Sequence, residues 1–441
     1  MPSPVFARLL VAPVSLILLL VACGGQPDSA APPATPSAAP TAADSTGPAT
    51  ATATAAPTAT PATTATANLT DGCAADDAAG DLFPDKVTFD EATGVTVTYS
   101  DTYKVVEVAP PSLAEPLRYV LVQCGTAPPA EGEHAGAQMI EVPVEEIVTL
   151  TTTNLPHLDA LDAVDRLVGV GTGAFVSTPS VAERVATGDI PDFADEAGQP
   201  DLERLVAAEP DLLVTDAFGD TVLDDVRRTI DAGVPTVVNA DFDERTLLGR
   251  AEWLKYTALF LNAEAAANAT YEDVAASYAE TAALAAAATE RPSVLLNTPF
   301  EGTWFVPGGA SFQADAIADA GGDYVFADDD ATGSLALDIE AVLDRAAQAD
   351  IWLQAGSVNG TLDDLAAMDQ RFTAIEAFAD GEVYAYDALT TEGGGNAVFE
   401  EAYTRADLYL ADLTAMLHPE LLPDHDLRYF GRVPSADGEG G

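Results

Sequence analysis

Basic residues are scarce in this chain of 441 residues. Lys and Arg together number 18 against 71 Asp and Glu, so the formal net charge is −53. Because a surface this acidic repels phosphate backbones, nucleic-acid binding is excluded as a function. Only three of the basic residues are lysines. Salt would screen the self-repulsion of such a surface, so either a saline habitat or a bias of the lineage accounts for it.

Long apolar runs are lacking beyond the N-terminus. The run Leu9–Ala22 follows Arg8 and precedes Cys23, a pattern typical of a secretory signal peptide. The run is shorter than the ~20 residues that span a bilayer. The sequence LVAC at 20–23 resembles the bacterial lipobox, in which the cysteine becomes the lipid-modified N-terminus. We therefore expect residues 1–22 to be a lipoprotein signal peptide and Cys23 to carry the lipid; the alternative is an ordinary signal peptide with a chance cysteine.

Large apolar residues are also absent from residues 26–68, which consist almost wholly of Ala, Thr, Pro and Ser. A segment of this composition cannot bury a core and stays extended. We predict that residues 23–70 form a tether between the lipid and a globular body. The protein is therefore expected to be extracytoplasmic and lipid-anchored to the cell membrane.

Cysteine and histidine are few. With Cys23 lipid-modified, Cys73 and Cys124 remain, and an even number in an oxidising compartment predicts a disulfide between them. These two cysteines bracket alternating, β-branched runs, so residues 71–141 are predicted to form a small β-rich extension. The four histidines are scattered, with none within a helical turn of another, so no metal site is predicted.

Short β-branched runs alternate with helical patterns from residue 142 onward. Strands are expected at 146–150, 166–170, 211–215, 235–239, 293–297, 351–354 and 383–386. A long helical region, 244–290, separates the two groups of strands and is interrupted near Asn262. The pattern predicts an α/β protein with two Rossmann-like lobes of parallel-type sheets, 142–262 and 291–430, joined by one long helix, 263–290. A ligand cleft is expected between the lobes.

Five segments, in this order, carry a resemblance to a known family. They are PDLERLVAAEPDLL (200–213), DAGVPTVV (231–238), PGGASFQADAIADAGG (307–322), SLALDIEAVL (334–343) and LHPEL (417–421). On these segments, residues from about 141 to 425 resemble the class III periplasmic binding proteins, the solute-binding proteins of ABC importers that carry ferric siderophores, cobalamin and haem. The β-rich extension is a departure from the family's pattern, and its role is left open.

The resemblance implies a function and partners. The protein would be a monomeric, non-enzymatic substrate-binding lipoprotein that delivers a small metal chelate to an ABC permease and its ATPase. In the family, one glutamate on each lobe forms salt bridges with permease arginines. Glu203 and Glu340 occupy the matching motifs, each in the first turn of a predicted helix, where the helix dipole favours a carboxylate. The alternative is that each glutamate only stabilises its own helix.

Loops at the carboxyl ends of the predicted strands supply candidate ligand-binding residues. These are Thr152, Thr153, Asn154, Phe175 and Phe218 in the first lobe, and Phe300, Trp304, Phe305 and Asn396 in the second. Aromatic rings with hydroxyl and amide groups suit a bulky, partly apolar chelate, although any one ring could belong to the core. Arginine is scarce in these loops, which favours a neutral hydroxamate-type ferric chelate or a corrinoid over an anionic catecholate. No cofactor of the protein's own is expected.

Other functions have weaker support. A glycine-rich segment, 169–174, partly matches a dinucleotide-binding loop, but no helix start follows it. The acidic turn at 328–333 lacks the glutamate that would complete a calcium loop. No Gly-x-Ser-x-Gly motif is present, which makes a secreted hydrolase the weaker alternative. A tethered sensor or adhesion module is the other.

Overall fold

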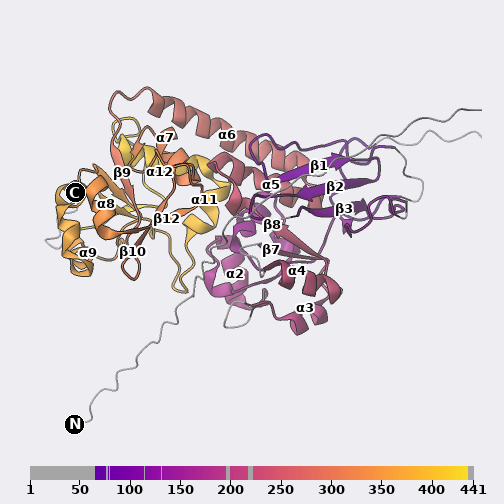
Figure 1. Ribbon diagram of the computed structural model, residues 1–441. Coiled ribbons are helices and arrows are strands. Elements are labelled where there is room, and N and C mark those ends of the chain that lie inside the picture. Colours follow the sequence, from indigo (N-terminus) through magenta and orange to yellow (C-terminus); the bar gives the residue numbers. More distant parts are fainter. Residues whose placement is uncertain are drawn as a thin grey trace, which may run out of the picture. The chain divides into compact units, whose positions relative to one another are not determined.

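The computed structural model describes residues 65–75, 78, 80–113, 115–130, 132–194, 199–216 and 222–435. All of them belong to one compact unit, Ala59–Gly441 (Figure 1). The predicted signal peptide, Cys23, most of the predicted tether and Phe218 lie outside the described residues. Within the described part, no helix is both long and apolar enough to cross a membrane.

A small β-sheet precedes the two lobes, as predicted. Its strands are β1 Val95–Tyr99, β2 Tyr103–Val108, β3 Leu117–Gln123 and β4 Gln138–Val142, in the order β1-β2-β3-β4. We call residues 65–142 the N-terminal segment. A Cys73–Cys124 disulfide lies within it. Alternate residues of β2 are buried, and Val106 and Val108 join the same hydrophobic core as the first lobe. The segment therefore packs on the first lobe and has no separate core.

The first lobe is a four-stranded parallel sheet with helices packed around it. Its strands, in the spatial order β6-β5-β7-β8, are β5 Ile147–Thr149, β6 Leu167–Val170, β7 Leu212–Asp216 and β8 Thr236–Asn239. Its helices are α1 Leu155–Ala160, α2 Pro179–Thr187, α3 Leu202–Ala208 and α4 Val222–Asp231. The β5, β7 and β8 strands are buried along almost their whole length, as expected of a sheet covered on both faces.

Two helices connect the lobes, with the break at the residue predicted. Helix α5, Leu247–Leu261, ends where Asn262 adopts a left-handed conformation (φ 55°), and α6, Glu264–Ala286, follows. The two helices pack against each other. Almost every residue of α5 is buried. The connection is therefore a pair of packed helices, of which α6 corresponds to the single helix expected from the sequence.

The second lobe contains a five-stranded sheet and a two-stranded one. The larger sheet has the order β11-β9-β13-β14-β15, with β9 Ser293–Leu296, β11 Asp323–Tyr324, β13 Ile351–Leu353, β14 Val383–Ala385 and β15 Gly431–Arg432. All its pairs are parallel except β14–β15. The smaller sheet pairs β10 Thr303–Pro307 with β12 Ser334–Asp338. The helices are α7 Phe312–Asp319, α8 Ile339–Ala346, α9 Leu362–Met368, α10 Glu376–Asp380, α11 Glu401–Thr404 and α12 Ala406–Leu417.

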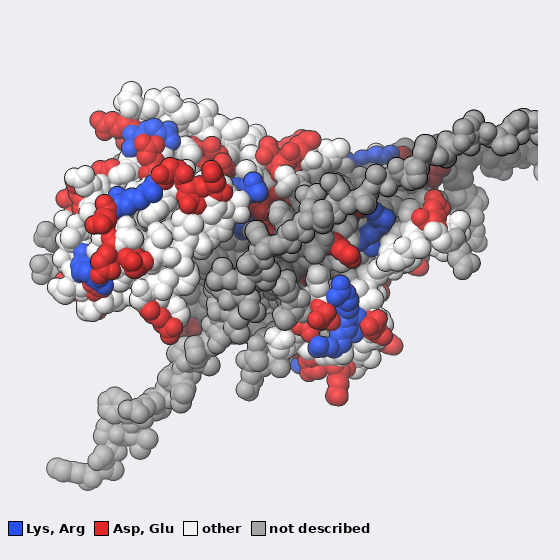
Figure 2. Space-filling model, in the orientation of Figure 1, with Lys and Arg blue, Asp and Glu red and all other residues white. Residues whose placement is uncertain are grey.

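The surface carries the acidity that the composition predicts. Figure 2 shows Asp and Glu over much of the face in view, with Lys and Arg in small groups beside them. Many of these basic side chains form exposed ion pairs, such as Arg118 with Glu107 and Arg291 with Asp323. Exposed pairs of this kind contribute little to stability, so the fold rests on the cores of the lobes.

Candidate ligand-binding site

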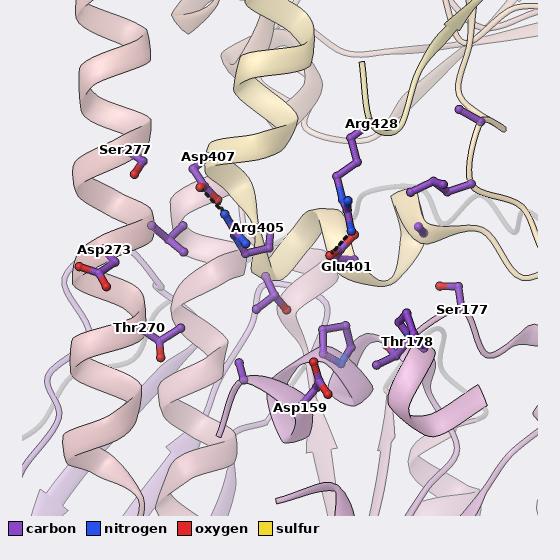
Figure 3. Close-up of a pocket in the computed structure, with 18 of the residues that line it drawn as sticks. Asp159, Ser177, Thr178, Thr270, Asp273, Ser277, Glu401, Arg405, Asp407 and Arg428 are labelled. Atoms are coloured by element: carbon purple, nitrogen blue, oxygen red, sulfur yellow. Dashed lines mark hydrogen bonds and ion pairs between the residues drawn. The ribbon is translucent and has the colours of Figure 1, made fainter. Parts of the chain in front are cut away.

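A cavity of about 790 Å³ lies between the two lobes (Figure 3). Its walls come from α1 and the start of α2 in the first lobe, from α6, and from residues 388–407 and Arg428 of the second lobe. Ligand pockets typically measure ~300–1,000 Å³, so a small organic chelate would fit. We call this cavity the inter-lobe pocket.

The pocket lies where the topology predicts a ligand site. Helix α1 follows β5, Ser177 and Thr178 follow β6, and residues 388–397 follow β14. All three strands belong to parallel ladders, whose carboxyl ends present ligand-binding loops at one edge of the sheet. The two lobes thus contribute equivalent edges to one pocket.

The second-lobe wall contains two arginines, each paired with a carboxylate. Arg405 donates to both carboxylate oxygens of Asp407 at 2.9 and 2.8 Å, and this hydrogen bonding raises the pKa of Arg405. Arg428 likewise donates to Glu401 at 2.8 and 2.7 Å. Both pairs are drawn in Figure 3. Because each guanidinium is already matched in two-point geometry, neither is an unoccupied anion receptor.

The rest of the wall is acidic and rich in hydroxyl groups. Helix α6 contributes Thr270, Asp273 and Ser277, which lie on one face of the helix (Figure 3). Helix α1 contributes Asp159, whose carboxylate accepts a hydrogen bond from Ser180. Once the two ion pairs are set aside, Asp159 and Asp273 remain, so the pocket carries an excess of negative charge.

One buried glutamate joins the lobes beside the pocket. Glu400 of the second lobe is 1% exposed. Its carboxylate accepts hydrogen bonds from the backbone N–H groups of Ser177 (3.0 Å) and Thr178 (2.6 Å) and from the Thr178 hydroxyl. Burial raises the pKa of Glu400. Since Ser177 and Thr178 also line the pocket, this contact holds one of its walls in place.

The glycine run at 393–395 forms another contact between the two lobes. A side chain at Gly395 would place its Cβ 2.2 Å from the backbone oxygen of Phe175, and Gly393 has the same relation to Ala174. Only glycine allows the backbones of the two lobes to approach this closely. The Thr391 hydroxyl adds a hydrogen bond of 3.3 Å to the oxygen of Ala174.

A buried polar cluster lies elsewhere in the lobe interface. Asn239 donates to the Thr153 hydroxyl at 3.0 Å, and burial raises the pKa of the neighbouring Asp241. The guanidinium of Arg250 lies 3.8 Å from the ring centre of Phe312, a second-lobe residue. Asn239 Oδ1, Asp241 Oδ2 and Arg250 Nε have no hydrogen-bond partner among the described residues.

None of the described residues predicted to bind the ligand is among those that line the pocket. Thr152, Thr153 and Asn154 form the turn before α1, and Asn154 is buried. Phe175 and Phe300 are 52% and 63% exposed, whereas Phe305 is half-buried. Asn396 donates to the backbone oxygen of Tyr386. Their role in binding stays a prediction.

Trp304 requires a correction, because it is fully buried in the second-lobe core. Its indole N–H donates to the backbone oxygen of Leu296 at 3.0 Å. Its ring packs against Trp352 and Phe372, both with centroids 5.7 Å away. With no exposed surface, the ring cannot stack on a ligand in this conformation.

The sequence reasoning missed the residues that do line the pocket. The spacing of Thr270, Asp273 and Ser277 places them on one helical face, which could have marked α6 as a polar wall. The Glu401–Arg428 pair carries no such signal, because it joins residues 27 positions apart.

The two predicted docking glutamates are at helix starts, as expected. Glu203 and Glu340 are exposed in the first turns of α3 and α8. Glu340 also pairs with Arg371 of its own lobe. Each helix has an aspartate N-cap, since Asp201 accepts from the Arg204 N–H (3.1 Å) and Asp338 from the Ala341 N–H (2.8 Å).

Two α/β lobes with a pocket at the carboxyl ends of their strands are the arrangement of a solute-binding protein. Residues 147–389 match the family described as periplasmic binding protein, a match that covers more than half of the chain. The protein therefore belongs to the periplasmic binding protein family. As a member of this family, it is an extracytoplasmic solute-binding protein of the ABC-transporter type, which binds a small ligand and works with a transporter.

Curated relatives are two uncharacterized lipoproteins of Methanocaldococcus jannaschii. One is 27% identical over 339 residues, or 72% of this chain and 80% of the relative. The other is 22% identical over 304 residues, or 66% of this chain and 70% of the relative. This chain therefore covers more than two thirds of the length of each relative.

Solved structures show the same fold. A periplasmic heme-binding protein of Pseudomonas aeruginosa has 20% identity and a TM-score of 0.51, covering 66% of this chain and 99% of its own. A possible iron-binding, periplasmic solute-binding protein of Staphylococcus epidermidis has 18% identity and a TM-score of 0.50, covering 63% and 99%. A periplasmic binding protein of Veillonella parvula has 16% identity and a TM-score of 0.51, covering 76% and 98%.

Proposed function

We propose that this protein captures a neutral or cationic metal chelate, either a hydroxamate-type ferric siderophore or a corrinoid, and delivers it to an ABC permease and its ATPase. The observation that carries the proposal is the charge of the inter-lobe pocket, where both arginines are paired and two further carboxylates remain. The alternative functions considered from the sequence are a tethered sensor and an adhesion module, neither of which would transport a ligand.

The pocket chemistry discriminates among chelates. An anionic catecholate complex or a haem with two carboxylates would compete with Asp407 and Glu401 for the arginines. Displacing either carboxylate costs about 0.2–1 kcal/mol, because both arginine side chains are partly exposed. A cationic or neutral chelate leaves both pairs intact and meets the hydroxyl groups of Thr270 and Ser277. The Staphylococcus epidermidis structure, described as possibly iron-binding, supports the same general class of ligand.

Thermal unfolding with a panel of chelates tests the proposal. Ferrioxamine B (cationic), ferrichrome (neutral), ferric enterobactin (anionic), cyanocobalamin and haemin would each be added to the purified protein. A ligand at 100 times its Kd stabilises the folded state by about 2.7 kcal/mol and so raises Tm. We expect a rise with ferrioxamine B, ferrichrome or cyanocobalamin and none with ferric enterobactin or haemin. No rise with any chelate, together with tight binding of a sugar or peptide, would overturn the proposal.

Substitution of the unpaired carboxylates locates the site. Asp273→Asn should weaken ferrioxamine B binding about three- to tenfold, because a partly solvated charge pair is worth ~1 kcal/mol. Asp363→Asn is the matched control, since Asp363 is exposed on α9 away from the pocket wall. Calorimetric titration of both variants would measure the difference. Equal affinities would remove Asp273 from the binding site.

Lipid anchoring at Cys23 is part of the proposal. The LVAC sequence and the two archaeal relatives described as lipoproteins support it. Cys23→Ser should move the protein from the membrane fraction into the medium without a change in ligand affinity. A variant that still sediments with membranes would exclude Cys23 as the anchor.

We also propose Glu203 and Glu340 as the docking pair for the permease. Both are exposed on short helices of different lobes, and Glu340 would exchange Arg371 for a permease arginine. Glu203→Ala/Glu340→Ala should abolish uptake of the chelate while ligand affinity is unchanged, because truncation leaves the arginine partners unpaired. Normal uptake by this variant would exclude the two glutamates as the docking pair.

A further inference from the structure

The break between α5 and α6 is filled by a lysine from the N-terminal segment. Lys104 of β2 has no exposed surface. Its ammonium donates to the backbone oxygen of Leu259 (2.6 Å), to Asn262 Oδ1 (2.8 Å) and to Glu264 Oε1 (2.6 Å). Leu259 belongs to the last turn of α5, where carbonyl groups lack helical partners. One side chain thus bridges the end of α5, the break and the start of α6.

Other residues of the N-terminal segment complete this contact. Asn68 donates to Glu264 Oε2 at 2.8 Å. The Asn262 amide donates to the backbone oxygen of Leu69 and to Gln123 Oε1, both at 2.8 Å. Asn68 and Leu69 fall within the predicted tether, 23–70, yet Asn68 is only 9% exposed. The chain is therefore in contact with the helix break before the β-sheet begins.

The same segment donates hydrogen bonds to two further buried carboxylates, those of Glu244 just before α5 and Glu252 within it. Glu252 accepts hydrogen bonds from the backbone N–H groups of Asp90, Glu91 and Ala92 at 2.8–3.1 Å. Glu244 accepts from those of Thr93 and Gly94 at 2.9–3.0 Å. All these backbone donors precede residue 147, where the match to the family begins. The attachment is thus a set of buried, charged hydrogen bonds along the connection.

The break is also the point at which movement would alter the pocket. The second half of α5 packs in the first-lobe core through Trp253 and Leu254, and Ala267 at the start of α6 joins it, whereas Tyr271, Val274 and Tyr278 further along α6 pack in the second-lobe core. The first half of α5 also contributes Leu247 and Ala251 to the second-lobe core. The α6 residues that line the pocket lie just beyond the break. A change in the angle between the start of α6 and the first-lobe core would therefore move this wall and the second lobe relative to the first.

We infer that the N-terminal segment is a built-in clamp on the connection between the lobes, and that Lys104, with Asn68 and Gln123, limits how far the pocket opens. These residues are positioning residues, since they act on the pocket through the connecting helices. The inference rests on the proposed function only in assuming that the inter-lobe pocket holds the solute. Lobe opening can be measured without any ligand.

The test compares lobe distances in a charge-free variant. Lys104→Met/Glu264→Gln removes both charges and leaves an oxygen acceptor for Asn68, so no unpaired charge stays buried. Lys86→Met is the matched control, because Lys86 belongs to the same segment but forms an exposed pair with Asp81. Spin labels on Ala207→Cys and Asp363→Cys, in a Cys23→Ser background with the native disulfide oxidised, report the distance between the lobes.

In ligand-free protein, we expect one narrow distance distribution for the parent and for Lys86→Met. The double variant should give a broader distribution that extends to longer distances. If ferrioxamine B binds, its dissociation should be about tenfold faster, which corresponds to ~1.4 kcal/mol. A folded double variant with the parent's distance distribution overturns the clamp. Failure of every chelate to bind would instead overturn the proposed function and leave the distance result standing.

Discussion

The Glu400 contact leads to the sharpest prediction about lobe movement. Glu400→Ala removes a buried carboxylate of the second lobe that accepts three hydrogen bonds from Ser177 and Thr178 of the first. In the closed arrangement, two backbone N–H groups and one hydroxyl would then lose their acceptor. Opening of the lobes exposes these donors to water, so the substitution penalises the closed state alone.

The magnitude follows from the number and kind of these bonds. A hydrogen bond to a charged group contributes about 1.5–3 kcal/mol, and part of each is recovered when the donor meets water. We expect a net loss of about 2–4 kcal/mol in the free energy of closure, or a roughly 30- to 900-fold fall in the ratio of closed to open protein. Glu400→Gln keeps one acceptor oxygen and should cost about half as much.

The spin-label pair described above measures this ratio. Glu400→Ala should shift most of the ligand-free population to longer distances, and Glu400→Gln should give an intermediate distribution. Glu392→Gln is the control, since Glu392 is exposed in the adjacent loop. Chelate dissociation, measured by displacement, should accelerate in the same order.

One result would refute this reasoning. If Glu400→Ala retains the parent's melting temperature, distance distribution and dissociation rate, the contact does not control closure.

Three further predictions concern stability. Trp304→Ala should lower the free energy of unfolding by about 3–5 kcal/mol, because it empties a core site. The chelate affinity of the folded variant should stay within about twofold. Calorimetry and ligand titration measure the two quantities, and weaker binding at unchanged Tm would contradict the core assignment. Burial, together with Asp319 and Glu91, raises the pKa of Asp315 to about 6. The folded state therefore holds this proton more tightly than the unfolded chain, and stability is lost as pH rises from about 4 to about 6. In urea unfolding, Asp315→Asn should recover ~1 kcal/mol at pH 7 but not at pH 4. An equal gain at both pH values would exclude titration of Asp315 as the cause. Burial lowers the pKa of His157 to about 3, so the free energy of unfolding should fall as pH drops below ~6.5. His157→Gln should reduce the slope of this fall with pH. An unchanged slope would exclude His157 as its source.

Local patterns were sufficient to predict much of the fold. Each of the seven predicted strands overlaps an observed strand, because short β-branched runs between helical stretches leave few alternatives. The helix break at Asn262 and the acidic first turns of α3 and α8 were also predictable from the sequence. These features depend on neighbours within a few residues, which the sequence displays directly.

The direction in which side chains face was not predictable in the same way. Trp304 and Phe305 are consecutive in β10, so they point to opposite faces of the strand, and either could have faced a ligand. Trp304 is buried because its ring packs against Trp352 of β13 and against Phe372 of the 3₁₀ helix Gln370–Ala374. Which face of a strand is inward depends on partners far away in the chain.

The sequence by itself therefore determined the predicted signal peptide and lipobox, the alternation of strands and helices, and the acidic surface. Only the tertiary structure decided which residues line the pocket and what the N-terminal segment does. The Lys104–Glu264 pair joins residues 160 positions apart, and Glu400 contacts Thr178 across 222. No local period encodes such contacts, because they arise only when the lobes, the connecting helices and the N-terminal segment pack together.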